Sequence, residues 1–177
     1  IVEPVYYTAL AVNDTGFGIN EDVDVVRQDE QSGVVSRDFH SQIDSESDIE
    51  KIRMPVITHD AEASEANFAG ARELLGDILE VKKRGFTHHW FAPWDELIRW
   101  WDVEKALLDL AMRPELVHLA MRRLTDGYLS RLQQWKDLDL LTHAPGNYRV
   151  GSGGLAYTDA IPAEGFDAAH VRTIDQW

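Results

Sequence analysis

The stretch Asn147-Tyr148-Arg149-Val150-Gly151-Ser152-Gly153-Gly154-Leu155-Ala156-Tyr157-Thr158-Asp159 is the most informative segment of this chain. Its clustered glycines allow left-handed backbone conformations and a close approach to a ligand. Residues 151–156 match the dinucleotide-binding pattern G-x-G-x-x-A, which requires a helix to begin in the glycines. Pro162 follows closely and prevents that helix. We therefore interpret the stretch as a long loop, which either only permits turns or lines a pocket with Ser152 and Tyr157 as hydrogen-bond donors.

Helical and extended patterns alternate before this loop. Apolar residues three or four positions apart predict helices over residues 60–84, 103–112 and 114–135, and Pro93-Trp94 begins another. Apolar, β-branched and aromatic residues predict strands over residues 5–12, 86–92 and 139–143. This alternation indicates an α/β fold with parallel strands. A complete (β/α)8 barrel needs about 250 residues, so we expect part of a TIM-type barrel.

Residues 1–60 have a different pattern from residues 61–177. Two short strands, over residues 23–27 and 34–39, are separated by a polar turn and predict a β-hairpin. Acidic residues surround it without the spacing of a calcium-binding loop, so we interpret them as a solvated face. Residues 45–52 predict a short helix or turn. We expect one domain, with an acidic N-terminal β-hairpin region at 1–60 and βα units with the glycine-rich loop at 61–177.

The composition excludes several function classes. The chain has 17 Lys and Arg residues against 31 Asp and Glu residues, a formal net charge of −14. Such a charge repels nucleic acids and anionic lipids, so we expect neither as a partner. The absence of cysteine excludes disulfides and thiolate chemistry within these residues. With no long apolar run, we expect a cytoplasmic protein. Because the chain begins at Ile1 and ends at Trp177, we expect an internal fragment of a longer protein.

Histidines and tryptophans are the other candidate functional groups. Adjacent residues on a strand face opposite sides, so either His88 or His89 would face a barrel interior and act as a proton donor. Either histidine is equally explained by hydrogen bonds within the fold, and adjacent positions make a poor metal site. Trp90 and Trp94 form an aromatic wall for a flat ligand or belong to the core. Asp95 either caps a helix or projects into a barrel mouth.

Together, these features resemble uroporphyrinogen decarboxylase-like proteins over roughly residues 86–177. The resemblance lies in residues 151–162, in the order of residues 88–95 and 104–109, and in Arg113-Pro114-Glu115 at the start of a long helix. It implies a (β/α)8 barrel with a pocket at its C-terminal mouth. Family members include tetrapyrrole decarboxylases and methyltransferases that use a corrinoid or a thiol. The methyltransferases hold zinc with histidine and cysteine, so that site cannot be complete in this cysteine-free chain. The arginine-rich motif of the decarboxylases is also absent.

The resemblance implies an enzyme, and we expect corrinoid-linked methyl transfer from a small methylated substrate. The alternatives are a lyase that decarboxylates a tetrapyrrole or another carboxylic acid, and a non-catalytic binding or scaffold domain. Expected partners are a small-molecule substrate and a corrinoid protein, with zinc only if its ligands lie outside this chain. We expect no metal ligands here. The candidate catalytic residues are His88, His89 and Asp95, and the candidate substrate-binding residues are Trp90, Trp94, Asn147, Gly151, Ser152, Gly153 and Tyr157.

Overall fold

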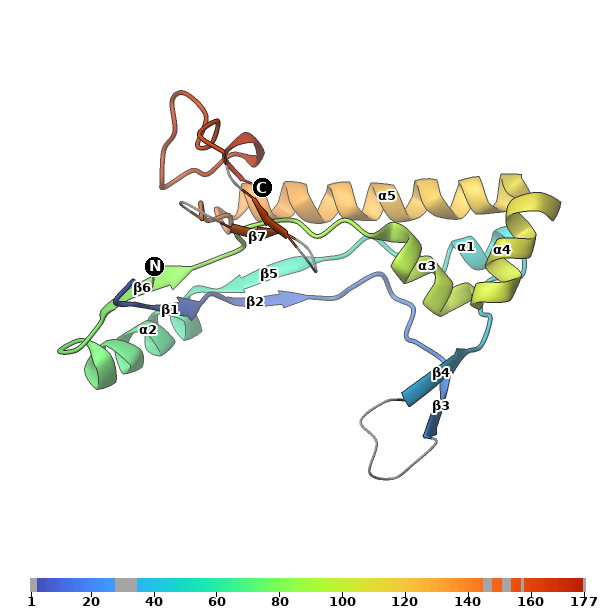
Figure 1. Cartoon of the computed structure of the whole chain (residues 1–177), viewed down its shortest axis with the longest axis horizontal. Helices are drawn as coiled ribbons and strands as arrows, with labels where there is room; N and C mark the ends of the chain where they lie inside the picture. The colour runs from blue at the N-terminus through green and yellow to red at the C-terminus, as the bar shows by residue number, and fades with distance from the viewer. Residues whose placement is uncertain (1–2, 28–34, 145–147, 151–153, 157, 177) are drawn as a thin grey trace. The chain divides into compact units, whose positions relative to one another are not determined.

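The chain forms two compact units. The computed structural model describes residues 3–27, 35–144, 148–150, 154–156 and 158–176 (Figure 1). Unit 1 consists of Ile1–Asp14, Ile57–Trp90 and Leu132–Trp177, and unit 2 of Thr15–Val56 and Phe91–Arg131. The described residues form five α-helices and four two-stranded sheets, with no closed barrel among them. The α/β class is therefore confirmed at the level of a mixed fold with small sheets.

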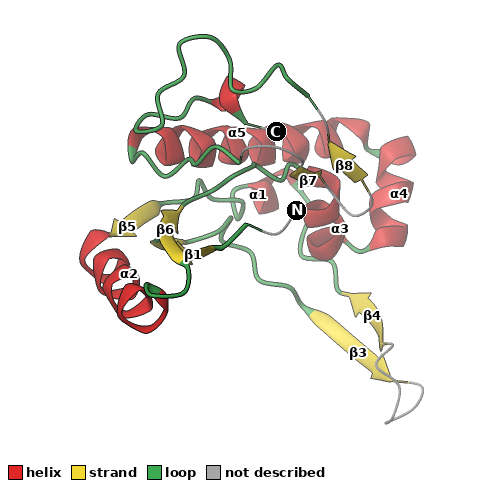
Figure 2. Cartoon of the chain, turned by 60° about the vertical axis from the view of Figure 1, so that its left-hand side comes forward, coloured by secondary structure: helices red, strands yellow, loops and turns green. Residues whose placement is uncertain are grey.

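Unit 1 contains two strand pairs beside one helix. Strand β1 (Val5–Ala9) pairs in parallel with β6 (Glu80–Arg84), and β2 (Ala11–Asp14) pairs antiparallel with β5 (Ile57–Asp60). The single strand predicted over residues 5–12 is thus divided at Leu10, whose N–H donates to the Arg84 carbonyl oxygen at 3.2 Å. Helix α2 (Ala61–Leu75) follows β5 directly and lies beside β1 and β6 (Figure 2).

The predicted helix over residues 60–84 is wrong at its C-terminal end. Its start is confirmed, because the Asp60 carboxylate accepts the Ala63 N–H at 2.8 Å. The helix ends at Leu75, and the Gly76 N–H donates to the Arg72 carbonyl oxygen at 2.9 Å. Residues 80–84 instead form β6, because pairing with β1 satisfies their backbone groups.

Two other predicted strands are reduced to a single bridge. Residues 86–92 and 139–143 do not form strands, and only Phe86 and Leu141 pair, in a parallel β-bridge. The glycine-rich stretch contains two short antiparallel strands, β7 (Tyr148–Val150) and β8 (Gly154–Ala156). The prediction of a continuous loop is wrong there, but no helix begins at Gly154, as Pro162 predicted. A 3₁₀-helix follows at Thr173–Asp175.

Unit 2 is mainly helical. Helices α1 (Glu46–Ile49), α3 (Pro93–Trp101), α4 (Val103–Met112) and α5 (Pro114–Asp137) are its helices, and α5 continues into unit 1. Strands β3 (Val23–Arg27) and β4 (Val35–Phe39) pair antiparallel, which confirms the predicted hairpin pairing. Pro114 begins α5 as predicted, because proline lacks the N–H that a first helical turn leaves unbonded. No helix of the described chain combines the length and apolar character that crossing a bilayer requires.

Each unit has its own apolar cluster. The cluster of unit 2 includes the fully buried side chains Leu97, Trp101 and Leu124. Gly127 allows close packing there, because a Cβ at this position would lie 2.9 Å from the Phe17 ring. The cluster of unit 1 is smaller and consists of Ile57, Trp135, Leu140, Leu141 and Val171, with partly buried neighbours.

Candidate ligand-binding site

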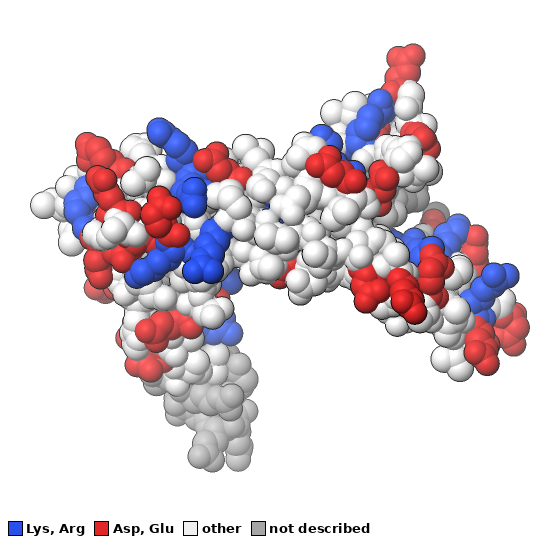
Figure 3. All heavy atoms as spheres, turned by 180° about the vertical axis from the view of Figure 1, so that it is seen from behind, with Lys and Arg blue, Asp and Glu red and all other residues white. Residues whose placement is uncertain are grey.

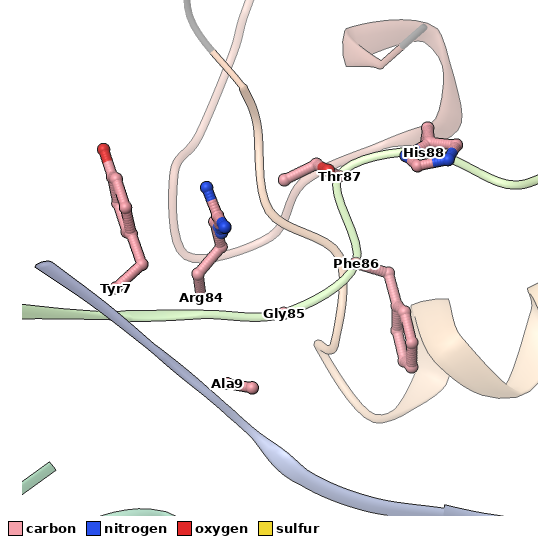
Figure 4. A pocket seen from close by; sticks show the side chains of 7 residues that line it. All are labelled: Tyr7, Ala9, Arg84, Gly85, Phe86, Thr87 and His88. Atoms are coloured by element: carbon pink, nitrogen blue, oxygen red, sulfur yellow. The ribbon is translucent and has the colours of Figure 1, made fainter. Parts of the chain in front are cut away.

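A pocket of about 250 Å³ lies in unit 1, just past the carboxyl ends of the parallel strands β1 and β6 (Figure 4). Ligands of α/β proteins commonly bind outside the carboxyl ends of parallel strands. Its lining residues are Tyr7, Ala9, Arg84, Gly85, Phe86, Thr87 and His88. The pocket thus includes one predicted catalytic residue, His88.

The strand register explains why Tyr7 and Arg84 meet. Side chains alternate along each strand, so Tyr7 and Arg84 lie on one face of the pair and Lys83 on the other. Helix α2 covers the Lys83 face, where Lys83 pairs with Glu65 and its Nζ lies 5.5 Å from the Phe68 ring centroid. Arg84 therefore extends from the face that α2 does not cover, next to Tyr7 (Figure 4).

Arg84 is the uncompensated cation of the pocket. Its guanidinium carbon lies 4.4 Å from the Tyr7 ring centroid, a cation–π geometry. Within the described parts of the chain, this guanidinium has no carboxylate or hydrogen-bond partner. The neighbouring Lys82 differs, since its Nζ lies 2.9 Å from Glu80 and this hydrogen bond raises the pKa of Lys82. The Arg84 donors therefore stay available to an anion.

The backbone after β6 is held by hydrogen bonds. The Phe86 N–H donates to the Leu140 carbonyl oxygen at 2.8 Å, and the Thr142 N–H returns a bond to Phe86 at 2.7 Å. Gly85 donates to the Thr142 hydroxyl at 2.9 Å, and a Cβ at Gly85 would collide with the Leu140 carbonyl. Gln176 donates to both the Phe86 and Thr142 carbonyls, at 2.7 and 3.1 Å. Glycine is thus required at the pocket wall.

The two adjacent histidines have different surroundings. His88 lines the pocket. Phe86 points away from Arg84 in Figure 4 and stacks on Trp135 with 3.9 Å between ring centroids. His89 packs edge-on against the same Trp135 at 5.1 Å. The two histidine side chains thus lie in different surroundings, although residues 86–92 do not form the predicted strand. Of the two, His88 is the one that lines the pocket and can contact a ligand.

Other predicted site residues lie elsewhere. Trp90 is exposed and does not line the pocket, whereas Trp94 packs against the core of unit 2. Asp95 is exposed in the first turn of α3. The N-cap of that helix is Ala92, whose carbonyl accepts the Asp95 N–H at 3.1 Å, so the expected cap at Asp95 is wrong.

The predicted ligand contacts from the glycine-rich stretch lie outside the described residues. These are Asn147, Gly151, Ser152, Gly153 and Tyr157. Their part in substrate binding stays a prediction.

The described residues do not fit the zinc of the methyltransferase branch. They contain no group of three histidine, aspartate or glutamate side chains able to hold a metal ion, and the sequence has no cysteine. His59 Nε2 instead lies 2.9 Å from the Ser64 hydroxyl, and His143 Nδ1 lies 2.8 Å from the Asp175 carbonyl oxygen.

Tyr7 and Arg84 are the pocket residues that the sequence did not reveal. Tyr7 belongs to the predicted strand over residues 5–12, and Arg84 is the last residue of the predicted helix over residues 60–84. Gly76 was the available signal, because glycine disfavours helix interiors and marks helix ends. Ending the helix there leaves residues 80–84 free to form a strand.

Acidic and basic side chains are interspersed on the face shown in Figure 3. No known protein family, curated protein or solved structure matches the chain.

Proposed function

We propose that this chain is part of an enzyme related to uroporphyrinogen decarboxylase-like proteins, which acts on a small anionic molecule bound in the pocket past β1 and β6. The observation that carries the proposal is the uncompensated Arg84 guanidinium in the same pocket as His88. A fixed cation beside a proton-transfer group suits an acid-bearing substrate. Within this proposal, the chain contributes βα units to a TIM-type barrel.

Arg84 would bind the acid group of the substrate. Its planar guanidinium can donate two parallel hydrogen bonds to a carboxylate or phosphate. The Tyr7 ring, 4.4 Å away, restricts the plane of the guanidinium and so orients those donors. A lysine would provide the charge without this fork.

The pocket volume limits the size of the ligand. Pockets for drug-sized ligands usually measure about 300–1,000 Å³, and this one measures about 250 Å³. It suits a small acid rather than a tetrapyrrole macrocycle. A corrinoid would therefore meet this substrate as a group carried by a partner protein.

The leading reaction is methyl transfer from a small methylated acid. The corrinoid would supply the nucleophile that accepts the methyl group. Arg84 would hold the acid group of the substrate, and His88 would donate a proton to the heteroatom that loses its methyl group. The resemblance supports this choice over other reactions of small acids.

The second candidate is decarboxylation of a small diacid, and the presence of both Arg84 and His88 in the pocket lining favours it. An arginine bound to the departing carboxylate would stabilise the reactant and slow the reaction. Arg84 would therefore hold the carboxylate that stays. The carbon–carbon bond to the other carboxyl breaks, carbon dioxide leaves, and His88 donates a proton to the carbon that keeps the electron pair.

Two parallel assays test this proposal. Methylcobalamin formation from cob(I)alamin and methoxy- or methylthio-substituted carboxylic acids measures methyl transfer, and carbon dioxide release from small dicarboxylic acids measures decarboxylation. We expect Arg84→Gln to raise KM at least tenfold, because a charged hydrogen-bonded pair is lost. We expect His88→Gln to lower kcat by about 100-fold with little change in KM.

Arg72→Gln is the matched control, since Arg72 is an exposed cation of α2 outside the pocket. It should leave both constants unchanged. Saturable binding of the acids with neither product would identify a binding domain instead of an enzyme. Absence of both binding and turnover would overturn the proposal.

A further inference from the structure

Helix α4 exposes an unusual amount of apolar surface. Only Ala106 and Asp109 of this helix are buried. Val103, Leu107 and Leu110 form one exposed stripe with i, i+4, i+7 spacing, and Leu108 and Met112 form a second. Leu107, Leu108 and Met112 are 56%, 61% and 71% exposed. Large exposed apolar patches on a protein surface commonly mark interaction sites.

The second stripe leads into a groove with acidic walls. A groove of about 400 Å³ is lined by Met112 and Leu116, with Asp44, Ser45, Glu46, Arg113 and Glu115 around them. Glu46 and Glu115, and Glu104 on α4, have no ion-pair partner among the residues described. The apolar surface is therefore bordered by uncompensated carboxylates.

The cations near this groove are already engaged. Arg113 donates to both Asp109 carboxylate oxygens at 2.7 and 2.6 Å, and to the Asp44 carbonyl at 2.6 Å. Lys105 pairs with Asp44 and donates to the Ser41 hydroxyl. The exposed Arg122 is seven residues beyond Glu115, about 10 Å along α5. The groove itself therefore presents a net negative field.

We propose that α4 and this groove dock a basic amphipathic helix of a partner protein. Leucines or similar residues of that helix would cover Leu107, Leu108 and Met112, and its lysines or arginines would pair with Glu46, Glu104 and Glu115. The charge pattern favours this occupant. A second copy of the chain would bring the same carboxylates to the interface, and an anionic membrane would be repelled. The proposal concerns unit 2 and does not depend on the pocket of unit 1.

A fluorescent Leu/Lys peptide of roughly 18 residues, long enough for five helical turns, serves as the probe. Its Leu/Glu counterpart is the control peptide. We expect one-to-one binding of the Leu/Lys peptide by fluorescence anisotropy. Leu108→Gln and Met112→Gln should each weaken it about tenfold, because each removes a buried apolar contact. Both positions are exposed, so circular dichroism should show an unchanged fold.

Two double variants with the same change in net charge distinguish binding at the groove from general attraction of a basic peptide to an acidic protein. Glu46→Gln with Glu115→Gln should weaken binding several-fold and reduce its salt dependence. Glu62→Gln with Glu73→Gln changes the net charge equally on α2 of unit 1 and should have little effect. Equal losses in the two double variants would overturn the proposal, as would equal binding of the Leu/Glu peptide. A dimer in sedimentation velocity that Leu108→Gln dissociates, without peptide binding, would assign the face to self-association instead.

Discussion

Unit 2 contains the larger apolar cluster, whereas in unit 1 a smaller apolar cluster is supplemented by hydrogen bonds between segments that are distant in sequence. The apolar cluster of unit 2 joins α3, α4 and α5 around fully buried side chains such as Leu97, Trp101 and Leu124. In unit 1 the buried Asp175 and Ser64 connect segments that are distant in sequence. Strand pairing and Gln176 complete that framework.

This difference bears on where the pocket lies. Hydrogen bonds are directional, so a polar framework fixes the positions of the groups it joins. In unit 1 such bonds hold Gly85 and Phe86, which lie between Arg84 and His88 in the sequence. The apolar core of unit 2 supplies stability, while the polar framework of unit 1 supplies a defined site.

The largest expected effect is in the core of unit 2. Leu124→Ala should lower the free energy of unfolding by about 2–5 kcal/mol, because it leaves a cavity at a fully buried position. Urea denaturation measures the loss. Leu129→Ala on the same helix is the control, since Leu129 is 60% exposed, and should change stability by less than about 0.5 kcal/mol. Equal effects would contradict the assignment of an apolar core to unit 2.

The second largest effect is expected from removing a buried hydrogen-bonding group of unit 1. The buried Ser64 hydroxyl accepts the Ala11 N–H at 2.9 Å and donates to the Asp60 carbonyl at 2.8 Å. Ser64→Ala should destabilise the protein by about 1–3 kcal/mol, because buried polar groups lose their partner. Thermal unfolding measures it, with the exposed Glu73→Ala of the same helix as the control. If Ser64→Ala left the thermal stability unchanged, the hydrogen bonds of Ser64 would not be what stabilises unit 1.

A pH-dependent effect is expected at the C-terminal segment. The Arg172 guanidinium, and then the N–H groups of Arg172 and Ala163, lower the pKa of Asp175 from 3.8 to about 2. Since the folded-state pKa is lowered, the stabilisation is complete above about pH 4 and is lost as pH falls toward 2. The Ala163 amide proton shift should follow this change. Asp175→Asn should lower Tm by on the order of 5 °C at neutral pH and abolish the shift change, whereas a persisting change would contradict this role.

The smallest effect is local to the hairpin of unit 2. His40 Nδ1 lies 3.1 Å from Asp22 and Nε2 lies 3.2 Å from Asp24, and the hydrogen bond to Asp22 contributes most to raising the pKa of His40. A raised pKa means that this stabilisation is present below the ordinary value of 6.5 and disappears as pH rises through the folded value. NMR titration of the His40 ring should give a value above 6.5, which Asp22→Asn lowers. If Asp22→Asn also changed the NMR signals of core residues, the His40–Asp22 pair would have more than the small local effect expected of a surface ion pair.

Local sequence signals predicted the helices of unit 2 better than the site of unit 1. Val103–Met112 and the start of α5 at Pro114 match the structure because apolar spacing and proline act locally. Strand β6 was missed because Glu80–Arg84 is mostly charged and becomes a strand only by pairing with β1. Tyr7 and Arg84 are brought together by that long-range pairing, so no local pattern could show their contact.

His88 is a pocket residue, as the sequence predicted, but the predicted reason, alternation along a strand, is not what separates it from His89. Strand alternation was expected to separate it from His89, but the backbone there forms only the bridge at Phe86. Stacking of Phe86 on Trp135, with His89 against the same ring, distinguishes the two histidines instead. Aromatic packing of this kind depends on α5 and cannot be read from neighbouring residues.

Backbone NMR titration with succinate tests directly whether the pocket beside Arg84 binds small anions. We expect saturable chemical-shift changes of the amides of Ala9, Gly85, Thr87 and His88, which line the pocket. Arg84→Gln should abolish saturation, and the neutral succinamide should give no comparable shifts. Shifts that persist in Arg84→Gln, or that spread over surface cations of both units without saturation, would contradict the assignment of this pocket as an anion site.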